Sequence, residues 1–340
     1  MRSLKIGIIG ASGLVGKELI DMLEKVPWCE SIVPCVSEGS TVHHTPFRKT
    51  LVPMKIISAP ELFSCDIIFF AATGTLSKEW APRFAERGII VIDKSSAWRL
   101  DAAVPLVIPE VNAHALRHHN NIIASPNCTT TGIVMALAPI HRHARITELS
   151  ITTMQAASGG GKNGLYELDW QKEHGSEHIE PHVFPAIIAN NIIPQCEEFL
   201  GNLECRTTTE EEKLIHETRK ILDAPSMIIS AFCTRVPITI GHSAVMRFQL
   251  EQTMAYTEIR SSLNGTPGLE YRDEHTATAH DVRGTDMVYV SRLRAISPNN
   301  STSAFFAQSF WLWSVIDNIR KGAATNALHI ANYLVEHNLM

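Results

Sequence analysis

Residues 4–16 read LKIGIIGASGLVG, and this stretch decides the fold of the N-terminal part of the 340-residue chain. Leu4–Ile9 form a short apolar run typical of a buried strand, and apolar residues recur at helical spacing from Leu14 to Val26. Glycines between strand and helix let the backbone approach a pyrophosphate, to which the helix N-terminus offers N–H groups. The stretch therefore predicts a dinucleotide-binding loop; the alternative is a tight turn without a ligand.

Short apolar runs continue to alternate with helical patterns through the first 125 residues or so. The further strands that we expect are 31–36, 66–71, 89–92 and 122–124, with a helix at 77–87. The first of them is weakened by Pro34, which cannot donate to a strand ladder. Strands that alternate with helices predict a Rossmann-type, doubly wound parallel sheet.

The rhythm changes from about Glu148. Longer strand patterns that mix β-branched and polar residues predict a mixed or antiparallel sheet with one exposed face; they span 148–158, 226–239, 242–252 and 286–297. The final segment, Phe310 to Asn338, has a long amphipathic helical pattern interrupted around Gly322. The fold class that we expect is α/β, with an α+β second domain.

Composition excludes several classes of protein. The chain has 30 basic and 35 acidic residues, a net charge of −5, and 45% hydrophobic residues. This balance lacks the excess of positive charge that is typical of proteins that bind nucleic acid or an anionic membrane surface. No apolar stretch approaches the roughly 20 residues of a membrane span, and the N-terminus has no signal-peptide pattern. Seven scattered cysteines without CxxC argue against disulfides and zinc ribbons. We expect a cytoplasmic protein.

Cys128 has different neighbours from the other cysteines. It lies in SPNCTTTG (125–132), directly before an apolar helical run. A helix start stabilises a thiolate and so favours a nucleophile, although a buried structural cysteine is the usual alternative. A thiol combined with a nicotinamide suggests aldehyde oxidation through a thiohemiacetal and a thioester, which water or phosphate can cleave. Arg235 and His242 could supply the cation and the base for such chemistry.

Cofactor choice should depend on residues 37–40, SEGS, after the second strand. Glu38 lies 22 residues beyond Gly16, where a carboxylate accepts hydrogen bonds from an unphosphorylated ribose and repels a 2′-phosphate. The residues alone therefore favour NAD slightly.

Seven motifs occur in the order typical of one family, and with the glycine loop the chain resembles the aspartate-semialdehyde dehydrogenases nearly end to end. They are DKSSAWR (93–99), VPLVIPEVN (104–112), PNC (126–128), QAASG (155–159), Glu210 to Lys213 ahead of ETRKIL (217–222), the 235–242 segment, and DNIRKGAA (317–324). The resemblance implies a dinucleotide-binding domain of residues 1–127 with 318–340 and a catalytic and dimerisation domain of residues 128–317.

The implied reaction is the reversible reductive dephosphorylation of L-4-aspartyl phosphate to L-aspartate 4-semialdehyde and inorganic phosphate, through a cysteine thioester. The family usually uses NADP, and NAD stays open here because Gly39 stands where the family often carries an arginine for the 2′-phosphate. The reaction belongs to the biosynthesis of lysine through diaminopimelate, and of threonine and methionine. The partners implied are a small-molecule substrate, phosphate and a second copy in a homodimer, with no nucleic acid and no membrane.

The resemblance also assigns roles to individual residues. It makes Cys128 the acyl-carrying nucleophile, His242 the acid/base and Gln155 the residue that orients the intermediate. It assigns the substrate α-carboxylate to Arg235, the substrate amino group to Glu210, and the phosphate or acyl phosphate to Arg99, Asn127 and Lys213. The cofactor would be lined by Gly10, Ser12, Gly13, Leu14, Val15, Ser37, Gly39, Ser40, Ser158, Gly159 and Asn318. Glu210 and Lys213 could instead form a plain i,i+3 salt bridge.

Other interpretations stay open. N-acetyl-glutamyl-phosphate reductase has a similar loop but a Pro-Gly-Cys motif, and glyceraldehyde-3-phosphate dehydrogenase lacks the Gln155 segment. An inactive paralogue acting as a binding protein should have lost Cys128, Arg235 or His242. Histidines 174, 178 and 182 recur every four residues, but Gly175 and Pro181 break the helix that a zinc site would need, so we predict no metal.

Overall fold

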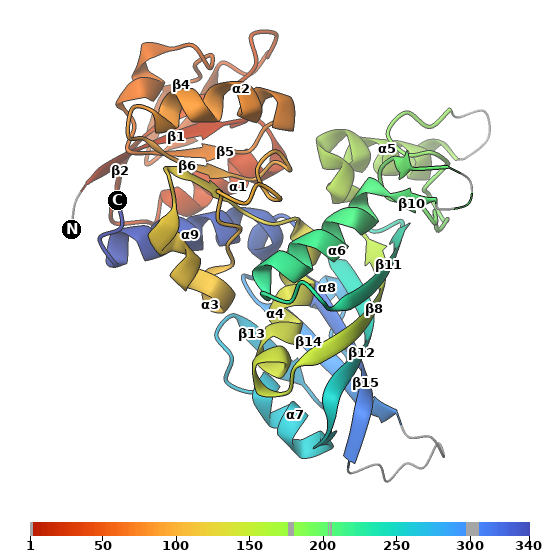
Figure 1. Ribbon diagram of the computed structural model, residues 1–340. Coiled ribbons are helices and arrows are strands. Elements are labelled where there is room, and N and C mark those ends of the chain that lie inside the picture. The colour runs from red at the N-terminus through yellow and green to blue at the C-terminus, as the bar shows by residue number, and fades with distance from the viewer. Residues whose placement is uncertain (1–2, 176–179, 203, 205, 297–305) are drawn as a thin grey trace. The chain divides into compact units, whose positions relative to one another are not determined.

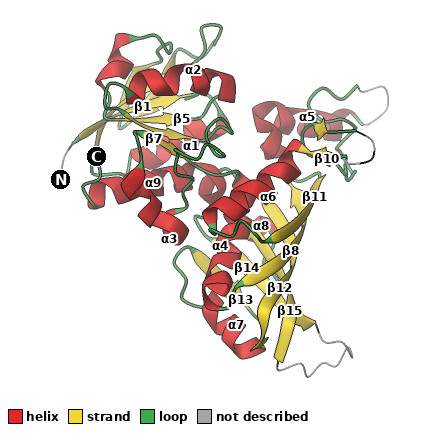
Figure 2. Ribbon diagram, in the orientation of Figure 1, coloured by secondary structure: helices red, strands yellow, loops and turns green. Residues whose placement is uncertain are grey.

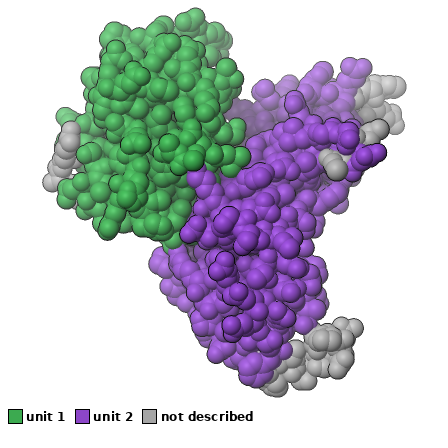
Figure 3. Space-filling view, viewed as in Figure 1, with its two compact units in different colours: residues 1–127, 323–340 green, residues 128–322 purple. Residues whose placement is uncertain are grey.

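The computed structural model describes residues 3–175, 180–202, 204, 206–296 and 306–340 (Figure 1). The chain divides into two compact units, which Figure 3 colours separately. Unit 1 contains residues 1–127 and 323–340, and unit 2 contains residues 128–322. The second crossing between units therefore falls after Gly322, five residues beyond the boundary expected from the sequence.

Unit 1 is built on a five-stranded parallel sheet with the order β2-β1-β5-β6-β7. The predicted doubly wound fold and its strands are confirmed, with shifts of a few residues at their ends. The bounds are β1 (Leu4–Ile9), α1 (Leu14–Leu23), β2 (Cys29–Cys35), β5 (Ile67–Phe70), α2 (Gly74–Ala85), β6 (Ile90–Asp93) and β7 (Ile122–Ala124). A hairpin of β3 (His44–Phe47) and β4 (Thr50–Pro53), short 3-10 turns η1 (Pro60–Ser64) and η2 (Ala113–His118), and α3 (Pro109–Asn112) complete it.

Pro34 lies inside β2, and the sheet tolerates it because β2 is an edge strand. Its register partner is Ile8 of β1, on the inner side. A proline cannot donate a ladder hydrogen bond, so it is accepted at a sheet edge. On the outer side of β2 the Pro34 carbonyl oxygen accepts a hydrogen bond of 2.8 Å from the Lys55 N–H.

The C-terminal helix α9 (Thr325–Glu336) belongs to the core of unit 1. Ala327, Ile330 and Leu334 are fully buried in one cluster with Leu4 and Ile6 of β1. The two ends of the chain thus contribute to one hydrophobic core, although more than 300 residues separate them in the sequence.

Unit 2 contains a six-stranded mixed sheet with the order β11-β8-β12-β15-β14-β13. The strands are β8 (Ile146–Gln155), β11 (Ile228–Arg235), β12 (His242–Ala255), β13 (Leu269–Arg272), β14 (Val288–Ile296) and β15 (Phe306–Ile316). Helices α4 (Cys128–His143), α6 (Thr209–Ile221) and α7 (Tyr256–Leu263) lie along one face (Figure 2). The remaining elements are η3 (Ala157–Gly160), α5 (Gly161–His174), β9 (Phe199–Leu200), β10 (Thr207–Thr208), α8 (Ala279–Val282) and η4 (Arg320–Ala324).

One prediction was wrong: residues 310–316 are not helical. They belong to β15, which pairs antiparallel with both β12 and β14. From Phe310 to Ser314 buried and partly buried positions alternate with the period of a strand, and pairing on both sides outweighs the helical pattern. Only the part from Arg320 onward turns into helix.

Among the described residues, no helix combines the length and the apolar character that a membrane crossing requires.

Candidate active site

Cys128 is the first residue of α4 and lies only partly buried. The other described cysteines are Cys29, Cys35, Cys65, Cys196 and Cys233, all of them buried. Burial raises the pKa of Cys29 to about 11 and that of Cys35, Cys65 and Cys196 to about 12, and it also raises the pKa of Cys233. Cys205 lies outside the described residues. Cys128 is thus the described thiol that combines access with a helix start, where thiolates are stabilised.

His242 begins β12 and is only 2% exposed. Its Nδ1 accepts a hydrogen bond of 3.0 Å from the backbone N–H of Ala156. Its Nε2 is buried and has no hydrogen-bond partner in the described protein. Burial, and then the positive charge of Arg235, hold the pKa of His242 well below its usual value. The ring is therefore held in place through Nδ1, and Nε2 can form a hydrogen bond with a ligand.

Cys128 and His242 are linked through the end of β15. Gly132, one helical turn after Cys128, packs so closely on Ile316 that a Cβ there would lie 3.0 Å from the Ile316 side chain. Ile316 is in turn the register partner of His242. Gly322 packs against Cys128 itself, because a Cβ on Gly322 would lie 2.9 Å from the cysteine Cβ. The helix start and the first residue of β12 therefore border the same end of the sheet.

Arg235 ends β11 opposite Gln155, the last residue of β8. It is buried, donates from Nη1 to the carbonyl oxygen of Ala156 at 2.9 Å, and has the Phe184 ring 5.7 Å from its guanidinium carbon. A Cβ on Gly159 would lie 2.3 Å from Arg235 Nη1 and 3.3 Å from His242 Nε2. Only glycine leaves room for the arginine and histidine to approach this loop so closely.

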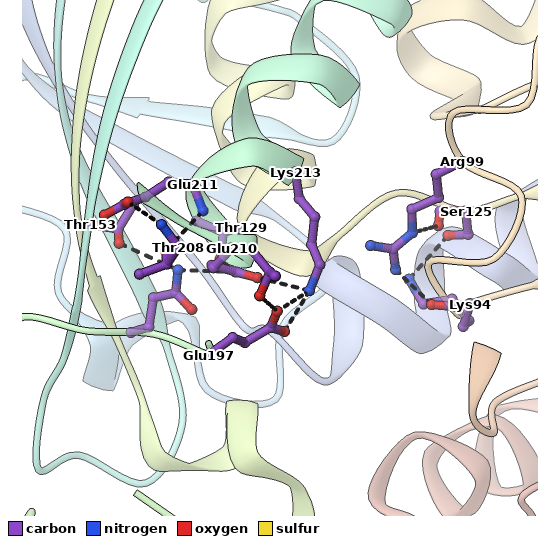
Figure 4. A network of polar contacts seen from close by, with 12 residues as sticks. Lys94, Arg99, Ser125, Thr129, Thr153, Glu197, Thr208, Glu210, Glu211 and Lys213 are labelled. Atoms are coloured by element: carbon purple, nitrogen blue, oxygen red, sulfur yellow. Dashed lines mark hydrogen bonds and ion pairs between the residues drawn. The ribbon is translucent and has the colours of Figure 1, made fainter. Parts of the chain in front are cut away.

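Glu210 and Gln155 are both buried, and Figure 4 shows Glu210 in a polar network with Lys213 and Glu197. Gln155 Nε2 donates to Glu210 Oε1 at 3.1 Å. Lys213 lies 3.5 Å from Glu210 Oε2, which is the i,i+3 pair that the sequence left open. Lys213 also binds both carboxylate oxygens of Glu197, and this contact lowers the pKa of Glu197. The lysine is thus positioned between two carboxylates.

Ser158 and Asn318 lie together in unit 2. The Asn318 side-chain oxygen accepts from the Gly241 backbone N–H at 3.0 Å, and its amide nitrogen lies 2.9 Å from Ser158 Oγ. Backbone bonds from Ala157 to Ile238 and from Ser158 to Thr239 join the same two loops. These contacts fix the segments that carry Gly159 and His242.

Arg99, in unit 1, is buried and its guanidinium is held by backbone carbonyls. It donates from Nε to Ser125 and from Nη2 to Lys94, at 3.1 and 2.6 Å (Figure 4). Lys94 binds Ser125 Oγ and the carbonyl oxygen of Pro126. Asn127 follows this segment and is also buried. A cation fixed in this way loses little side-chain entropy when an anion binds.

The glycine loop has the features that a dinucleotide needs. Gly10 adopts φ +83°, and a Cβ there would lie 2.3 Å from the carbonyl oxygen of Ala71. A Cβ on Gly16 would lie 2.3 Å from the Gly10 carbonyl oxygen, so helix and turn are in close contact. Gly13 caps α1, and Leu14 and Val15 are its first residues. Ser12 belongs to the same turn, and Ser37, Gly39 and Ser40 follow β2. The close approach of turn and helix at Gly10 and Gly16 fits a dinucleotide, and the contribution of Ser37, Gly39 and Ser40 stays a prediction.

No cluster of metal-binding side chains occurs among the residues that the structure describes. His174 stacks on Trp170 with ring centroids 4.4 Å apart and bonds to its carbonyl oxygen. His178 lies outside the described residues.

Within unit 2 the structure brings together Cys128, Gln155, Arg235, His242, Glu210 and Lys213. Arg99, Asn127 and the glycine loop belong to unit 1. The sequence did not predict three contacts of the site: the ion pair of Glu197 with Lys213, the Phe184 ring beside the Arg235 guanidinium, and the hydrogen bond from the Ala156 N–H to His242. The one local signal at Glu197 is its φ of +63°, which is visible only in the structure. Glu197 and Phe184 lie in none of the motifs found in the sequence, and Ala156 lies in QAASG, a motif that does not reveal its bond to His242.

Comparison with known proteins gives one consistent result. Residues 5–119 match the family model described as "Semialdehyde dehydrogenase, NAD binding domain", and residues 137–321 match "Semialdehyde dehydrogenase, dimerisation domain". The chain is 37% identical to an aspartate-semialdehyde dehydrogenase of Aquifex aeolicus, over 99% of both chains. It is 34% identical to that of Bacillus subtilis, over 100% of this chain and 99% of the relative.

A solved structure agrees with these relatives. The crystal structure of aspartate semialdehyde dehydrogenase II complexed with ASA from Vibrio cholerae matches with a TM-score of 0.91 and 34% identity, over 99% of each chain.

Proposed function

The chain belongs to the aspartate-semialdehyde dehydrogenase family, and we propose that it reversibly converts L-4-aspartyl phosphate to L-aspartate 4-semialdehyde and inorganic phosphate. This is a step of amino-acid biosynthesis in the aspartate pathway. The observation that carries the proposal is the partly accessible Cys128 at a helix start, at the same end of the sheet as a buried histidine with an unpartnered Nε2.

Cys128 is the nucleophile in this proposal. Its thiolate attacks the acyl carbon of the substrate, phosphate leaves, and a thioester remains on the sulfur. Gln155 and His242 are the other catalytic residues. Gln155 is held by its bond to Glu210 and orients the acyl group, while His242 acts on the oxygen that develops charge.

Substrate binding divides between two sets of charges. Arg235 keeps one N–H on the Ala156 carbonyl and directs its fork to the α-carboxylate, while Glu210 binds the substrate amino group. Lys213, Arg99 and Asn127 bind the phosphate. Because Lys213 already pairs with Glu197, the anion competes with a carboxylate for the lysine.

Unit 1 would hold the cofactor, NADP with NAD as the alternative. The residues that fit it are Gly10, Ser12, Gly13, Leu14, Val15, Ser37, Gly39 and Ser40, with Ser158, Gly159 and Asn318 contributed by unit 2. When bound, the nicotinamide takes up or delivers the hydride. The helix α1 N-terminus offers N–H groups to its phosphates.

The test is an oxidative assay with aspartate semialdehyde, phosphate and each nicotinamide cofactor in turn. We expect phosphate-dependent turnover, loss of turnover in Cys128→Ala, and near-normal turnover in the matched control Cys65→Ala. Absence of turnover with either cofactor would exclude the proposed activity. Turnover that survives Cys128→Ala would exclude the thioester mechanism.

A homodimer is the second part of the proposal, and the uncovered face of the unit 2 sheet supports it. Register pairs place Phe232, Thr152, Val245 and Trp313 in one row across four strands, all on the face opposite α4. Phe232 is 52% exposed and Ile228, four residues earlier on the same face of β11, is 64% exposed. An adjacent row contains Arg247, Trp311 and Arg294.

This face also has a hollow of about 440 Å³, lined by Val245, Thr276, Arg292, Arg294, Trp311, Leu312 and Trp313. Aromatic residues and arginine are the types enriched in protein interfaces. All of these residues lie within 137–321, the range that matches the dimerisation model. A second copy of the chain is therefore the occupant that we propose.

Sedimentation equilibrium tests the dimer. The wild type should sediment at twice its 37.7 kDa chain mass, and Phe232→Asp should shift it toward the monomer. Leu51→Asp, at a residue 67% exposed in unit 1, is the matched control and should remain dimeric. A monomeric wild type at micromolar concentration would contradict the proposal.

A further inference from the structure

The Phe184 ring lies beside the guanidinium of Arg235, with 5.7 Å between the ring centroid and Cζ. We propose that Phe184 is a positioning residue, whose ring fixes the face of the guanidinium so that the N–H groups along its edge meet the substrate α-carboxylate. The inference rests on the proposed function, which assigns that carboxylate to Arg235. Two side chains of α5, Glu167 and Gln171, hold the segment that carries the ring.

Arg235 is buried and is held at its backbone as well as at its side chain. Its N–H donates to the Ile193 carbonyl oxygen at 2.8 Å, and its own carbonyl oxygen accepts from the Ile193 N–H at 2.9 Å. Its Nη1 donates to the Ala156 carbonyl oxygen at 2.9 Å. No ion pair of Arg235 occurs within the part of the chain that the structure describes. A buried cation needs other groups to replace its hydration, and the ring and the carbonyl do so.

An aromatic ring stabilises a guanidinium without using its hydrogen-bond donors. The negative face of the ring attracts the cation, while a carboxylate binds to the N–H groups in the guanidinium plane. Lys213 illustrates the opposite arrangement, because the Glu197 carboxylate occupies its ammonium group. The anion that we assign to Lys213 has to compete with that carboxylate. Phe184 holds Arg235 without such competition.

Phe184 is itself fixed by close packing. It is 6% exposed, and its ring lies against the backbone at the start of α5. A Cβ on Gly164 would lie 3.0 Å from Phe184 Cζ, and a Cβ on Gly160 would lie 3.3 Å from Cε1. The ring also belongs to an apolar cluster with Ala157, Leu168, Ile188 and Ile193. Side chains packed this closely keep one position, so the ring stays beside the arginine.

The segment that carries Phe184 has no regular structure of its own. Residues 180–192, all of which the structure describes, form no helix or strand. Their backbone N–H groups therefore need partners elsewhere. Glu167 Oε2 accepts from the N–H groups of His182 and Val183, at 2.9 and 2.6 Å. The carboxylate thus holds the two residues directly before the ring.

Gln171, one helical turn after Glu167, holds the far end of the same segment. Its Oε1 accepts from the N–H groups of Ile188 and Ala189, at 2.9 and 3.1 Å. Its Nε2 donates to Glu167 Oε1 at 3.3 Å. Both side chains are buried, where polar groups are stable only when they are hydrogen-bonded. The pair is therefore an anchor for the segment on both sides of Phe184.

Phe184→Leu keeps an apolar side chain and removes the face of the ring. We expect the KM for aspartate semialdehyde to rise about 10-fold, with kcat and the KM for phosphate changed by less than about two-fold. Phe63→Leu is the matched control, since the Phe63 ring also lies over an arginine, 4.4 Å from Arg87 Cζ in unit 1. This variant should leave all three constants unchanged.

Two results with Phe184→Leu would overturn the proposal. One is an unchanged KM for aspartate semialdehyde. The other is a fall in kcat together with equal rises in both KM values, because a ring that only supports the fold would affect both substrates alike.

An exchange of the two α5 residues tests the anchor. In Glu167→Gln two amide groups face each other, and one of them must turn its N–H groups toward a backbone N–H. The double variant Glu167→Gln/Gln171→Glu again pairs one amide with one carboxylate. We expect the KM for aspartate semialdehyde to rise about five-fold in the single variant and to return to within about two-fold in the double variant. A double variant as impaired as the single one would overturn the role of this pair.

NMR with selective 15N-arginine labelling follows Arg235 without turnover. Its Nε–H signal, assigned by its loss in Arg235→Lys, should exchange with water at least about 10-fold faster in Phe184→Leu than in the wild type. Equal exchange rates in the two proteins would overturn the proposal. If the wild type fails to turn over aspartate semialdehyde, the proposed function fails, and the exchange rates still decide whether the ring fixes the guanidinium.

Discussion

The two units build their binding groups in different ways. In unit 1 the groups that we propose for cofactor binding are backbone N–H groups within one short segment, residues 10–15, where glycines allow the close approach of turn and helix. In unit 2 the proposed chemistry depends on side chains from three neighbouring strands that pairing brings to one end of the sheet. Gln155 and Arg235 are the last residues of β8 and β11, and His242 is the first of β12. Ligand binding in unit 1 should therefore be sensitive to substitutions that change the backbone conformation. Activity in unit 2 should be sensitive to substitutions that replace one functional group by another.

The largest expected effect is the difference in alkylation rate between Cys128 and the buried cysteines. Burial raises the pKa of Cys35 and Cys196 to about 12, which leaves almost no thiolate at neutral pH, whereas Cys128 is partly accessible at a helix start. We expect iodoacetamide to label Cys128 at least about 1000-fold faster than the five buried cysteines. Peptide mass mapping over time measures the rates. In guanidinium all should react alike; rapid labelling of a buried cysteine in the folded protein would contradict this account.

Arg235→Lys tests the dependence of unit 2 on chemical group. Lysine keeps the charge but loses the planar fork, so we expect kcat/KM for aspartate semialdehyde to fall about 100-fold. Arg283→Lys, on the exposed surface of the same unit, should change it less than two-fold. Equal kcat/KM values for the two variants would show that Arg235 does not bind the substrate.

Gly10→Ala tests the dependence of unit 1 on backbone shape. The new Cβ would lie 2.3 Å from the Ala71 carbonyl at φ +83°, so we expect a loss of about 3 kcal/mol in unfolding free energy and weakened cofactor binding. Gly39→Ala is the matched control for stability, because nothing lies within 4 Å of its Cβ position. Chemical denaturation measures the unfolding free energy, and cofactor fluorescence titration measures the cofactor affinity. Similar stability of the two variants would contradict the strain argument.

Glu38→Gln should have the smallest effect. Glu38 is exposed in the turn after β2, where we expect its charge to disfavour a 2′-phosphate. Because an exposed charge contributes little, we expect the NADP-to-NAD ratio of kcat/KM to rise only about five-fold. A ratio that stays constant would show that Glu38 plays no part in cofactor choice.

The same contrast explains what could be predicted from the sequence. The strand, turn and helix of residues 4–16 are local, so the sheet of unit 1 followed from spacing alone. The sequence also marked Cys128 by its helix start. It could not reveal the Ala156–His242 bond, because this contact joins loops 86 residues apart. Nor could it show that 310–316 form a strand, since that depends on partners on both sides.

Glu197 illustrates the same limit. Its carboxylate binds Lys213, 16 residues away, and its own backbone is in the left-handed region. Neither property follows from its neighbours in the chain. Long-range pairing creates the side-chain site, and only the motifs of a known family anticipate such a site from sequence.

Trapping the acyl-enzyme tests the central claim most directly. The protein is mixed with L-4-aspartyl phosphate without a nicotinamide cofactor, and intact mass and peptide mapping are recorded. We predict release of about one phosphate per chain and an aspartyl group in thioester linkage on Cys128, cleavable by hydroxylamine. The absence of an adduct, or an adduct on another residue, would contradict the account.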